Sequence, residues 1–243
     1  MTVLDYEIVG EGRPLVLLHG FYGDRTTWTA SGHVAGLAGD FRLVLVDLPG
    51  HGRSPAPHDP IPYALHRQAD DVAAVLDDAG IGRAAVWGSS LGGTVALTLL
   101  ARHPGRVGAL IANGAHAEAA SGDPEPENTI FREQGMAPFL AMLGPVPDGI
   151  RAPMERADPL ALAALNSALA EIPALPGALA APILLLVGEK DRALARARES
   201  AGRIPGARLV ELPGCGHLDS FTRTDLTLPL VREFLAGGAG VAW

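Results

Sequence analysis

Five consecutive residues in the first half of the chain, Gly88-Ser89-Ser90-Leu91-Gly92, place a serine between small residues. Glycines two positions before and after Ser90 allow a tight turn from a strand into a helix, with the serine hydroxyl projecting outward. The preceding segment AAVW is typical of a strand, and the following TVALTLLARH is typical of a helix. A helix N-terminus there would favour negative charge that develops beside the serine. The pattern therefore predicts that Ser90 is a nucleophile.

Two other interpretations of this turn stay open. The five-residue pattern is common by chance, so a glycine-rich turn in an α/β protein can contain an incidental serine. A phosphate-binding loop is less well supported, because no lysine follows the glycines.

A serine hydroxyl needs a base within hydrogen-bond reach. We expect His217 to be that base, because it follows a predicted strand on a glycine-rich loop that can carry the imidazole over the sheet. His19 ends a strand and is expected to shape the backbone, and His51 lies in the turn LPGHGRS. Four histidines are expected on solvated helix faces or in polar loops: His33, His58, His66 and His103.

The base in turn needs a carboxylate that orients its ring. Asp191 comes just after the aliphatic run ILLLVG, and so lies beyond the carboxyl end of a predicted buried strand, where α/β sheets place active groups. Glu189 is the second choice, and Asn113, at the end of the preceding strand, carries no charge. The chain order serine, aspartate, histidine is the order of nucleophile-elbow enzymes.

Aliphatic runs alternate with helical patterns and must position these residues. The expected strands are 3–9, 15–18, 43–46, 84–87, 107–112, 183–187 and 208–212. The expected helices are 34–38, 65–79, 91–102, 193–203 and a last helix that starts or kinks at Pro229 and ends near residue 236. This alternation predicts an α/β fold with a mostly parallel sheet and helices on both faces.

The alternation is interrupted once. Residues 116–180 contain no convincing strand, but have helical patterns at 130–143 and 159–171 on either side of PVPDG. We therefore expect a core made of 1–115 and 181–243, with 116–180 as a small helical cap insertion.

The composition excludes several classes of protein. The 243 residues are 48% hydrophobic, which is enough for a globular core. The net charge of −8 and the absence of a basic patch argue against nucleic-acid binding. The single cysteine, Cys215, excludes a disulfide framework and a thiolate zinc cluster, and we expect a loop thiol there. No metal or cofactor motif appears. Without a long apolar run or a signal peptide, the expected location is cytoplasmic.

Five stretches together resemble the α/β-hydrolase fold family, of the esterase, enol-lactonase and cofactor-free haloperoxidase type. These stretches are LVLLHGFYGD (15–24), VLVDLPGHGRS (44–54), WGSSLGGTVAL (87–97), PILLLVGEKD (182–191) and LPGCGHLDSF (212–221). The resemblance implies that Ser90 is the nucleophile, His217 the base and Asp191 its partner. It also implies an oxyanion hole made by the backbone N–H groups of Phe21 and Leu91. The chain departs from the family pattern after the aspartate, where RALARARE replaces a proline-rich turn.

We expect a serine hydrolase that forms an acyl-enzyme with a small-molecule ester, thioester or lactone. Two alternatives stay open: the same triad used for perhydrolysis, carbon–carbon cleavage or cyclisation in a biosynthetic pathway, and a binding protein with a silent triad. No nucleic-acid or membrane partner is indicated, and both monomer and homodimer stay open. With aromatic residues at 5%, we expect an aliphatic acyl pocket between sheet and insertion. The candidate lining residues are Gly20, Phe21, Tyr22, Trp28, Phe131, Met136, Phe139 and Met142.

Overall fold

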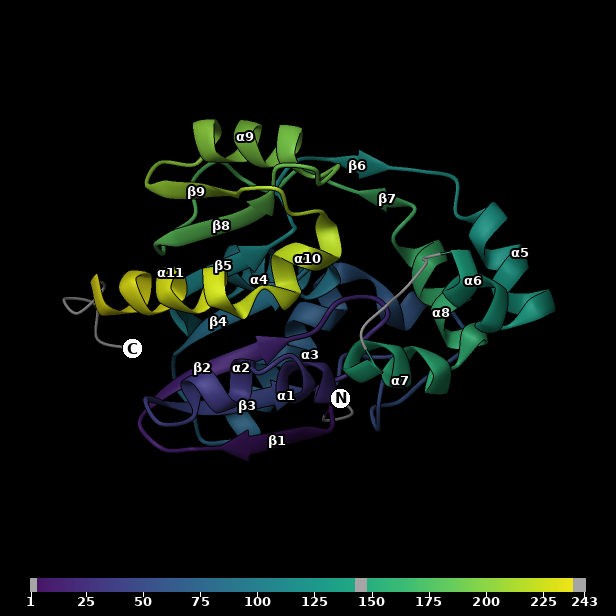
Figure 1. Cartoon of the computed structure of the whole chain (residues 1–243), viewed down its shortest axis with the longest axis horizontal. Coiled ribbons are helices and arrows are strands. Elements are labelled where there is room, and N and C mark those ends of the chain that lie inside the picture. Colours follow the sequence, from purple (N-terminus) through teal and green to yellow (C-terminus); the bar gives the residue numbers. More distant parts are fainter. Residues whose placement is uncertain (1–3, 143–147, 238–243) are drawn as a thin grey trace.

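The computed structural model describes residues 4–142 and 148–237, and a seven-stranded sheet forms its centre (Figure 1). The strand order is β1-β3-β2-β4-β5-β8-β9, and every pairing is parallel except that of β1 with β3. The strands are β1 Tyr6–Val9, β2 Arg13–Leu18, β3 Phe41–Val46, β4 Ala84–Ser89, β5 Val107–Asn113, β8 Ile183–Gly188 and β9 Ala207–Leu212. All residues of β4, β5 and β8 are buried, which explains their continuous aliphatic character.

Helices cover both faces of this sheet. Helix α4 packs on β2, β4 and β5 with α3 beside it, and α2 packs on β3 with α11 beside it (Figure 1). The helices of the core are α1 Thr26–Ala30, α2 His33–Leu37, α3 Leu65–Asp78, α4 Leu91–Arg102, α9 Leu194–Arg203, α10 His217–Thr222 and α11 Thr224–Gly237. Two short 3₁₀ turns, Ile61–Tyr63 and Pro104–Arg106, precede α3 and β5. The α/β architecture predicted from the alternation of elements is therefore confirmed.

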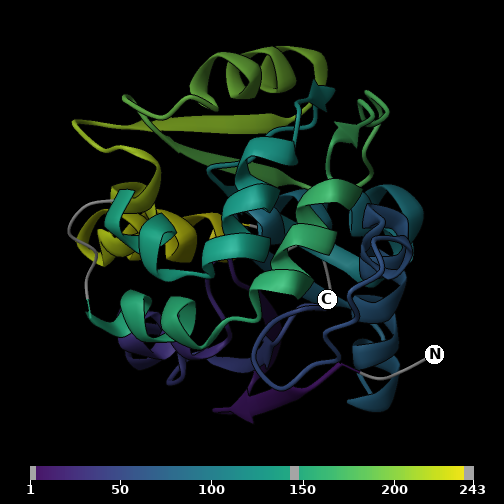
Figure 2. The same cartoon turned by 90° about the vertical axis from the view of Figure 1, so that its right-hand side faces the viewer.

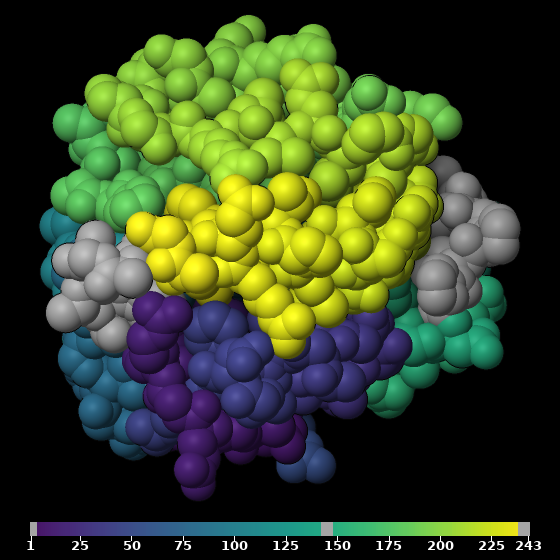
Figure 3. All heavy atoms as spheres, turned by 60° about the vertical axis from the view of Figure 1, so that its left-hand side comes forward, coloured from purple at the N-terminus to yellow at the C-terminus, as the bar shows by residue number. Residues whose placement is uncertain are grey.

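The C-terminal helix differs from its prediction. Helix α11 begins at Thr224, and Pro229 lies inside it rather than at its start. Thr227, Val231 and Leu235 are buried at a spacing of four residues, so packing carries the helix across the proline. In Figure 3 the C-terminal segment lies between the N-terminal third of the chain and the segment around α9 and β9.

The insertion consists mainly of helices, and these lie beyond the carboxyl ends of the parallel strands (Figures 1 and 2). They are α5 Glu125–Gln134, α6 Ala137–Met142, α7 Asp148–Arg156 and α8 Pro159–Ala168. Asp158 begins α8, because its carboxylate accepts the Leu160 and Ala161 amides. The expectation of no strand in this segment is wrong, since β6 Ala120–Ser121 pairs with β7 Glu171–Ile172. Two-residue strands are too short to show alternation. The boundaries 116 and 180 stay predictions.

Among the helices of residues 4–142 and 148–237, none combines the length and the apolar character that a membrane crossing requires. The cytoplasmic location stays a prediction.

Candidate active site

Ser90 stands at the sharp turn between β4 and α4. Its φ of 51° is positive, and no other non-glycine residue of the described chain has a positive φ. The flanking glycines make the turn sterically feasible: a Cβ on Gly88 would lie 2.1 Å from the Gly92 carbonyl oxygen, and one on Gly92 would lie 2.2 Å from that of Leu18. The strained serine conformation is thus held by close backbone packing on both sides.

Two hydrogen bonds connect Ser90, His217 and Asp191. The Ser90 Oγ lies 2.9 Å from His217 Nε2, and His217 Nδ1 lies 2.7 Å from Asp191 Oδ2. The second Asp191 oxygen accepts the Ala193 amide at 2.9 Å. Burial opposes ionisation of Asp191, but the hydrogen bonds from His217 and Ala193 outweigh it and hold the pKa of that carboxyl below its usual value. Asp191 is therefore placed as a charged, buried partner of an imidazole that is half exposed.

The sequence suggested that a loop carries His217. In the structure, His217 is instead the first residue of helix α10. The helix is held against the sheet by Ser220, whose hydroxyl accepts from Asn113 Nδ2 at 3.1 Å and donates to the His217 carbonyl at 2.8 Å. Asn113 therefore supports the backbone of His217 from the end of β5. Glu189, the second choice for the acid, instead accepts the Gly214 amide at 2.9 Å.

Two backbone amides beside Ser90 are free to bind an oxyanion. Among the described residues, neither the Phe21 N–H nor the Leu91 N–H has a hydrogen-bond acceptor. Leu91 follows the serine, and Gly20, the neighbour of Phe21, is so close that its Cβ would lie 3.5 Å from Ser90 Cβ. These two amides are the donors that the resemblance implied for an oxyanion hole, and their role stays a prediction.

The loop that carries Phe21 is fixed from several directions. The Leu48 amide donates to His19 Nε2 at 3.0 Å, so the proton of this ring is on Nδ1, which donates to the Gly20 carbonyl at 2.8 Å. Burial lowers the pKa of His19 to about 3 and keeps the ring neutral. His51 Nε2 lies 2.6 Å from the Phe21 carbonyl oxygen. From the cap, Arg156 reaches Asp24 at 3.1 Å.

A cavity of about 860 Å³ opens between the sheet and the cap, with Ser90 and His217 in its wall. Phe21, Tyr22 and Phe139 also line it, as the sequence predicted, and Gly20 lines a smaller adjoining cavity of about 140 Å³. The remaining lining residues were not singled out as lining from the sequence. These are His116, Glu127, Ile150, Met154, Asn166, Lys190, Asp191, Arg192, Ala193, Arg196 and Leu218. Aromatic and charged side chains form part of this wall, next to Ile150, Met154 and Leu218, and the preference for an aliphatic acyl group stays a prediction.

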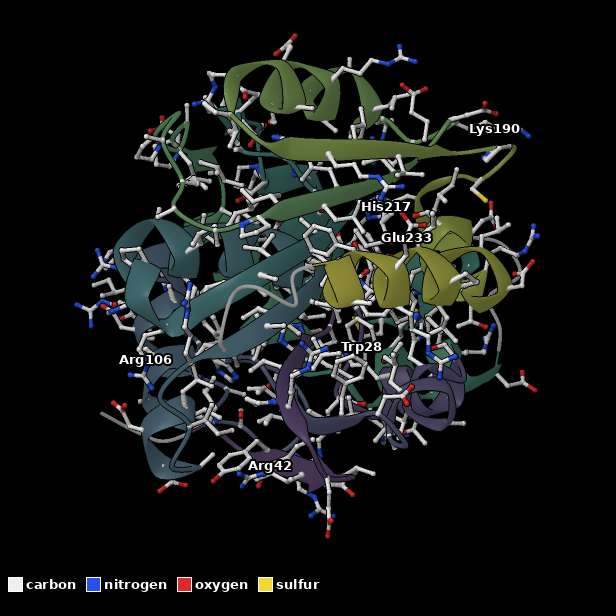
Figure 4. All side chains as sticks on the ribbon, turned by 90° about the vertical axis from the view of Figure 1, so that its left-hand side faces the viewer. Trp28, Arg42, Arg106, Lys190, His217 and Glu233 are labelled. Atoms are coloured by element: carbon white, nitrogen blue, oxygen red, sulfur yellow. The ribbon has the colours of Figure 1, made fainter. Side chains whose placement is uncertain are left out.

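Three predicted pocket residues lie elsewhere. Trp28 is fully buried and packs edge-on against Trp87 and Phe221, and in Figure 4 it lies inside the molecule, away from the surface. Phe131 is buried behind Phe21 and Phe139, and Met136 is buried in the hydrophobic core. The side chain of Met142 lies outside the described part of the chain.

His33 also corrects an expectation, because it is fully buried rather than solvated. Its ring stacks on Phe221 and meets Trp28 and Trp87 edge-on. Burial lowers the pKa of His33 to about 3. The helical spacing from Val34 onward did not reveal this, because two of the aromatic neighbours, Trp87 and Phe221, come from distant parts of the chain. His58 and His66 are exposed and His103 is half-buried.

In the part of the chain that the structure describes, no group of three or more histidine, cysteine, aspartate or glutamate side chains is arranged to hold a metal ion. Cys215 lies on a loop, as expected from the sequence, and its side chain is buried.

Comparison with known proteins identifies the family. Residues 13–177 match the model of the alpha/beta hydrolase fold family. The chain belongs to this family. Its relatives include a pimeloyl-[acyl-carrier protein] methyl ester esterase of Nitrosomonas europaea, 31% identical over 89% of this chain and 93% of the relative. A putative 2-succinyl-6-hydroxy-2,4-cyclohexadiene-1-carboxylate synthase of Bacillus subtilis is 26% identical over 97% of each chain. The crystal structure of the enol-lactonase from Burkholderia xenovorans has a TM-score of 0.83, at 30% identity over 96% of each chain.

Within this alpha/beta hydrolase, two of the polar lining residues that the sequence did not predict, Arg192 and Arg196, come from the segment after Asp191. The motif RALARARE was recognised as a departure from the family pattern, and Arg192 and Arg196 lie four residues apart in it. Only Arg196 lies in helix α9, because Arg192 belongs to the turn before it, so this spacing was not a helical signal in the sequence. Ile150 and Met154 of α7 show the same spacing. His116 carried no such signal.

Proposed function

We propose that this alpha/beta hydrolase is a serine hydrolase that cleaves a carboxylic ester, thioester or lactone through an acyl-enzyme on Ser90. The observation that carries the proposal is the continuous pair of hydrogen bonds, 2.9 Å from Ser90 to His217 and 2.7 Å from His217 to Asp191. A serine, an imidazole and a buried carboxylate in this order are the parts of a proton relay for acyl transfer. The esterase and lactonase relatives support the same reaction class.

The proposed first step begins with attack of Ser90 Oγ on the substrate carbonyl carbon, while His217 Nε2 takes the hydroxyl proton. Asp191 keeps the other ring proton on Nδ1 and stabilises the imidazolium that forms. The carbonyl oxygen becomes negative and accepts hydrogen bonds from the Phe21 and Leu91 amides. His217 then gives its proton to the leaving oxygen or sulfur as that bond breaks.

The second step repeats the chemistry with water. His217 takes a proton from water, the hydroxide attacks the acyl carbon, and Ser90 leaves as its oxygen regains the proton. The acid product and free enzyme result. No cofactor enters either step.

A fluorophosphonate probe tests the nucleophile directly. Attack of the Ser90 oxygen on phosphorus, with loss of fluoride, leaves a stable adduct that intact-mass and peptide mass spectrometry can locate. We expect labelling at Ser90 in the wild-type protein and in Ser89→Ala, and no labelling in Ser90→Ala. Labelling that persists in folded Ser90→Ala would refute the assignment. A folded wild-type protein that does not react would favour a binding protein with a silent triad.

A non-hydrolytic use of the same triad is the second candidate. The Bacillus subtilis relative, which is named as a synthase and spans nearly the whole chain, favours it. Product analysis separates the two reactions. Hydrolysis adds the elements of water to the substrate and gives a new carboxylic acid from the cleaved ester, whereas cyclisation or elimination gives a rearranged skeleton to which no water has been added.

A further inference from the structure

The cavity beside Ser90 has a cationic side that the proposed acyl transfer does not use. Arg192, in the turn before α9, and Arg196, in its first turn, both line this cavity. Lys190 lines it as well and is the only lysine of the chain. In Figure 4 Lys190 lies at the edge of the molecule, farther out than His217. Lys190, Arg192 and Arg196 are all exposed to solvent, so the positive charge lies along the open side of the cavity.

The arginines of this segment fall into two groups. Arg198 forms an ion pair with Glu211 at 2.7 Å, and Arg203 forms one with Glu118 at 2.9 Å. Neither of these arginines lines the cavity. Arg192 and Arg196 do line it, and within residues 4–142 and 148–237 neither has a carboxylate at ion-pair distance. Arg198 and Arg203, which do not line the cavity, are therefore ion-paired, whereas the exposed Arg192 and Arg196, which line it, form no ion pair with a described carboxylate.

Packing holds Arg196 next to His116. The Ser200 hydroxyl contacts the Arg196 carbonyl at 3.0 Å and accepts the Ala117 amide at 2.9 Å, so this turn of α9 lies against the segment after β5. His116 lines the cavity too, and its buried Nδ1 has no hydrogen-bond partner in the described residues. Burial and the positive charge of Arg196 lower the pKa of His116 and outweigh the opposing effects of Glu118 and Glu199, so the ring is neutral and adds no negative charge to this side of the cavity.

The acidic groups of the cavity do not cancel these charges. Asp191 is engaged by His217 and by the Ala193 amide. Glu127 lies on α5 in the cap, where Asn166 contacts it at 3.3 Å. The chain as a whole carries −8, so its general field repels anions. Two unpaired guanidinium groups in the cavity oppose that field locally, and their planar donor pairs match a carboxylate.

We propose that Arg192 and Arg196, with His116 beside them, form a subsite for a carboxylate of the substrate. The preferred substrates are then esters, thioesters or lactones that carry a free carboxylate in addition to the carbonyl that Ser90 attacks. This inference rests on the proposed function for its substrate class. The subsite itself can be tested without turnover.

The turnover test compares two matched ester series. One consists of monomethyl esters of dicarboxylic acids of increasing chain length, and the other replaces the free carboxylate by a primary amide of the same shape. For the preferred chain length, we expect the wild-type protein to favour the carboxylate by about tenfold or more in kcat/KM. In Arg192→Gln/Arg196→Gln this ratio falls to near one, mainly through KM for the carboxylate ester. Because Arg192 adjoins Asp191, Arg196→Gln alone is measured as well.

Arg198→Gln is the matched control, because it removes one positive charge from the same helix outside the cavity. We expect it to retain the wild-type preference. A preference that drops equally in Arg198→Gln would indicate a general field effect and overturn the subsite. A ratio that the double variant does not change would overturn it too.

A binding measurement separates failure of the subsite from failure of the proposed function. The Ser90→Ala protein is titrated calorimetrically with the free dicarboxylate of the preferred chain length, or with the whole series if no ester is cleaved. Binding that is lost in the double arginine variant supports the subsite even when no ester turns over. Turnover of both ester series without dicarboxylate binding overturns the subsite and leaves the hydrolase standing. If turnover depends on Arg192 and Arg196 only when the acyl group is attached to an acidic carrier protein, the carboxylate subsite is overturned. The two arginines would then belong to a docking surface for that carrier.

Discussion

Gly114 lies directly against the ring of His217. A methyl group on its Cα would stand 2.9 Å from Cε1 and 3.1 Å from Nδ1 of the imidazole, and 3.4 Å from Oδ2 of Asp191. The φ of Gly114 is +62°, which L side chains rarely adopt. The residue after β5 therefore leaves room for the hydrogen bond between His217 and Asp191, and a side chain there would compete with it.

Gly114→Ala is expected to lower kcat by about tenfold or more, because the methyl group displaces the imidazole from Ser90 and a small misplacement of a catalytic group is costly. Steady-state kinetics on a cleaved ester measure this. Gly80→Ala is the matched control, since Gly80 has a φ of +67° and nothing within 4 Å of the added methyl. Both variants should lose about 1 kcal/mol of stability, and only Gly114→Ala should lose activity. An equal effect on kcat would contradict the contact argument.

Ser90→Gly is expected to be inactive but about 1 kcal/mol more stable than Ser90→Ala. The reason is the φ of 51° at this position, where glycine avoids the strain that alanine retains. Chemical denaturation of the two inactive variants measures the difference. At residue 89 the glycine variant should instead be less stable than the alanine variant, because this residue has no positive φ and ends a strand. A Ser90→Gly protein less stable than Ser90→Ala would show that the turn is not strained.

Asp191→Asn is expected to lower kcat by about 10³-fold or more while the protein stays folded. The amide no longer stabilises the imidazolium, and it favours the wrong tautomer of His217. Glu189→Gln should have little effect, because Glu189 accepts from the Gly214 amide and does not meet the histidine. Comparing kcat for the two variants decides which acid serves the base. A larger loss in Glu189→Gln would reverse the assignment.

The free energy of unfolding should fall as the pH drops below about 6.5, and His33 should carry part of that fall. The folded state lowers the pKa of His33 to about 3, whereas the unfolded chain protonates it near 6.5. Between these values the unfolded state binds more protons, so stability is lost as the pH falls through this window. Between pH 7 and pH 5 the loss from this one group is about 2 kcal/mol.

Urea denaturation of the wild-type protein and of His33→Leu at both pH values measures this contribution. The variant should lose about 2 kcal/mol less than the wild-type protein between pH 7 and pH 5. Burial also lowers the pKa of His19 to about 3, but His19 is present in both proteins, so the comparison isolates the contribution of residue 33. Parallel losses in the two proteins would contradict the burial of a neutral His33.

Acidification should also lower activity, with a different cause. Protonated His217 has no lone pair on Nε2 with which to take the Ser90 proton. We expect kcat/KM to decline on acidification, under conditions where circular dichroism shows that the protein remains folded. Activity that does not fall as the solution is made acidic would argue against His217 as the base.

Local spacing in the sequence was sufficient to single out Ser90, Asp191 and His217, and the structure brings these three together. Gly88 and Gly92 report a turn that only small residues can make, and Asp191 follows an aliphatic run that only a buried strand requires. Such features are short-range, because a tight turn or a strand end depends on neighbours within a few residues. The same reasoning gave the parallel sheet and most of its helices.

Tertiary structure alone decided what surrounds these residues. Gly114 faces His217, and His33 stacks on Phe221, because segments far apart in the chain pack together. Trp28 belongs to that buried aromatic cluster and does not line the pocket, although a large aromatic side chain suits either place. Arg192 and Arg196 stand in the sequence as two charges among several, and only the fold shows that these two line the cavity while Arg198 and Arg203 form ion pairs elsewhere. Burial and ion pairing depend on which distant segments of the chain pack together, and the local spacing of residues does not determine that.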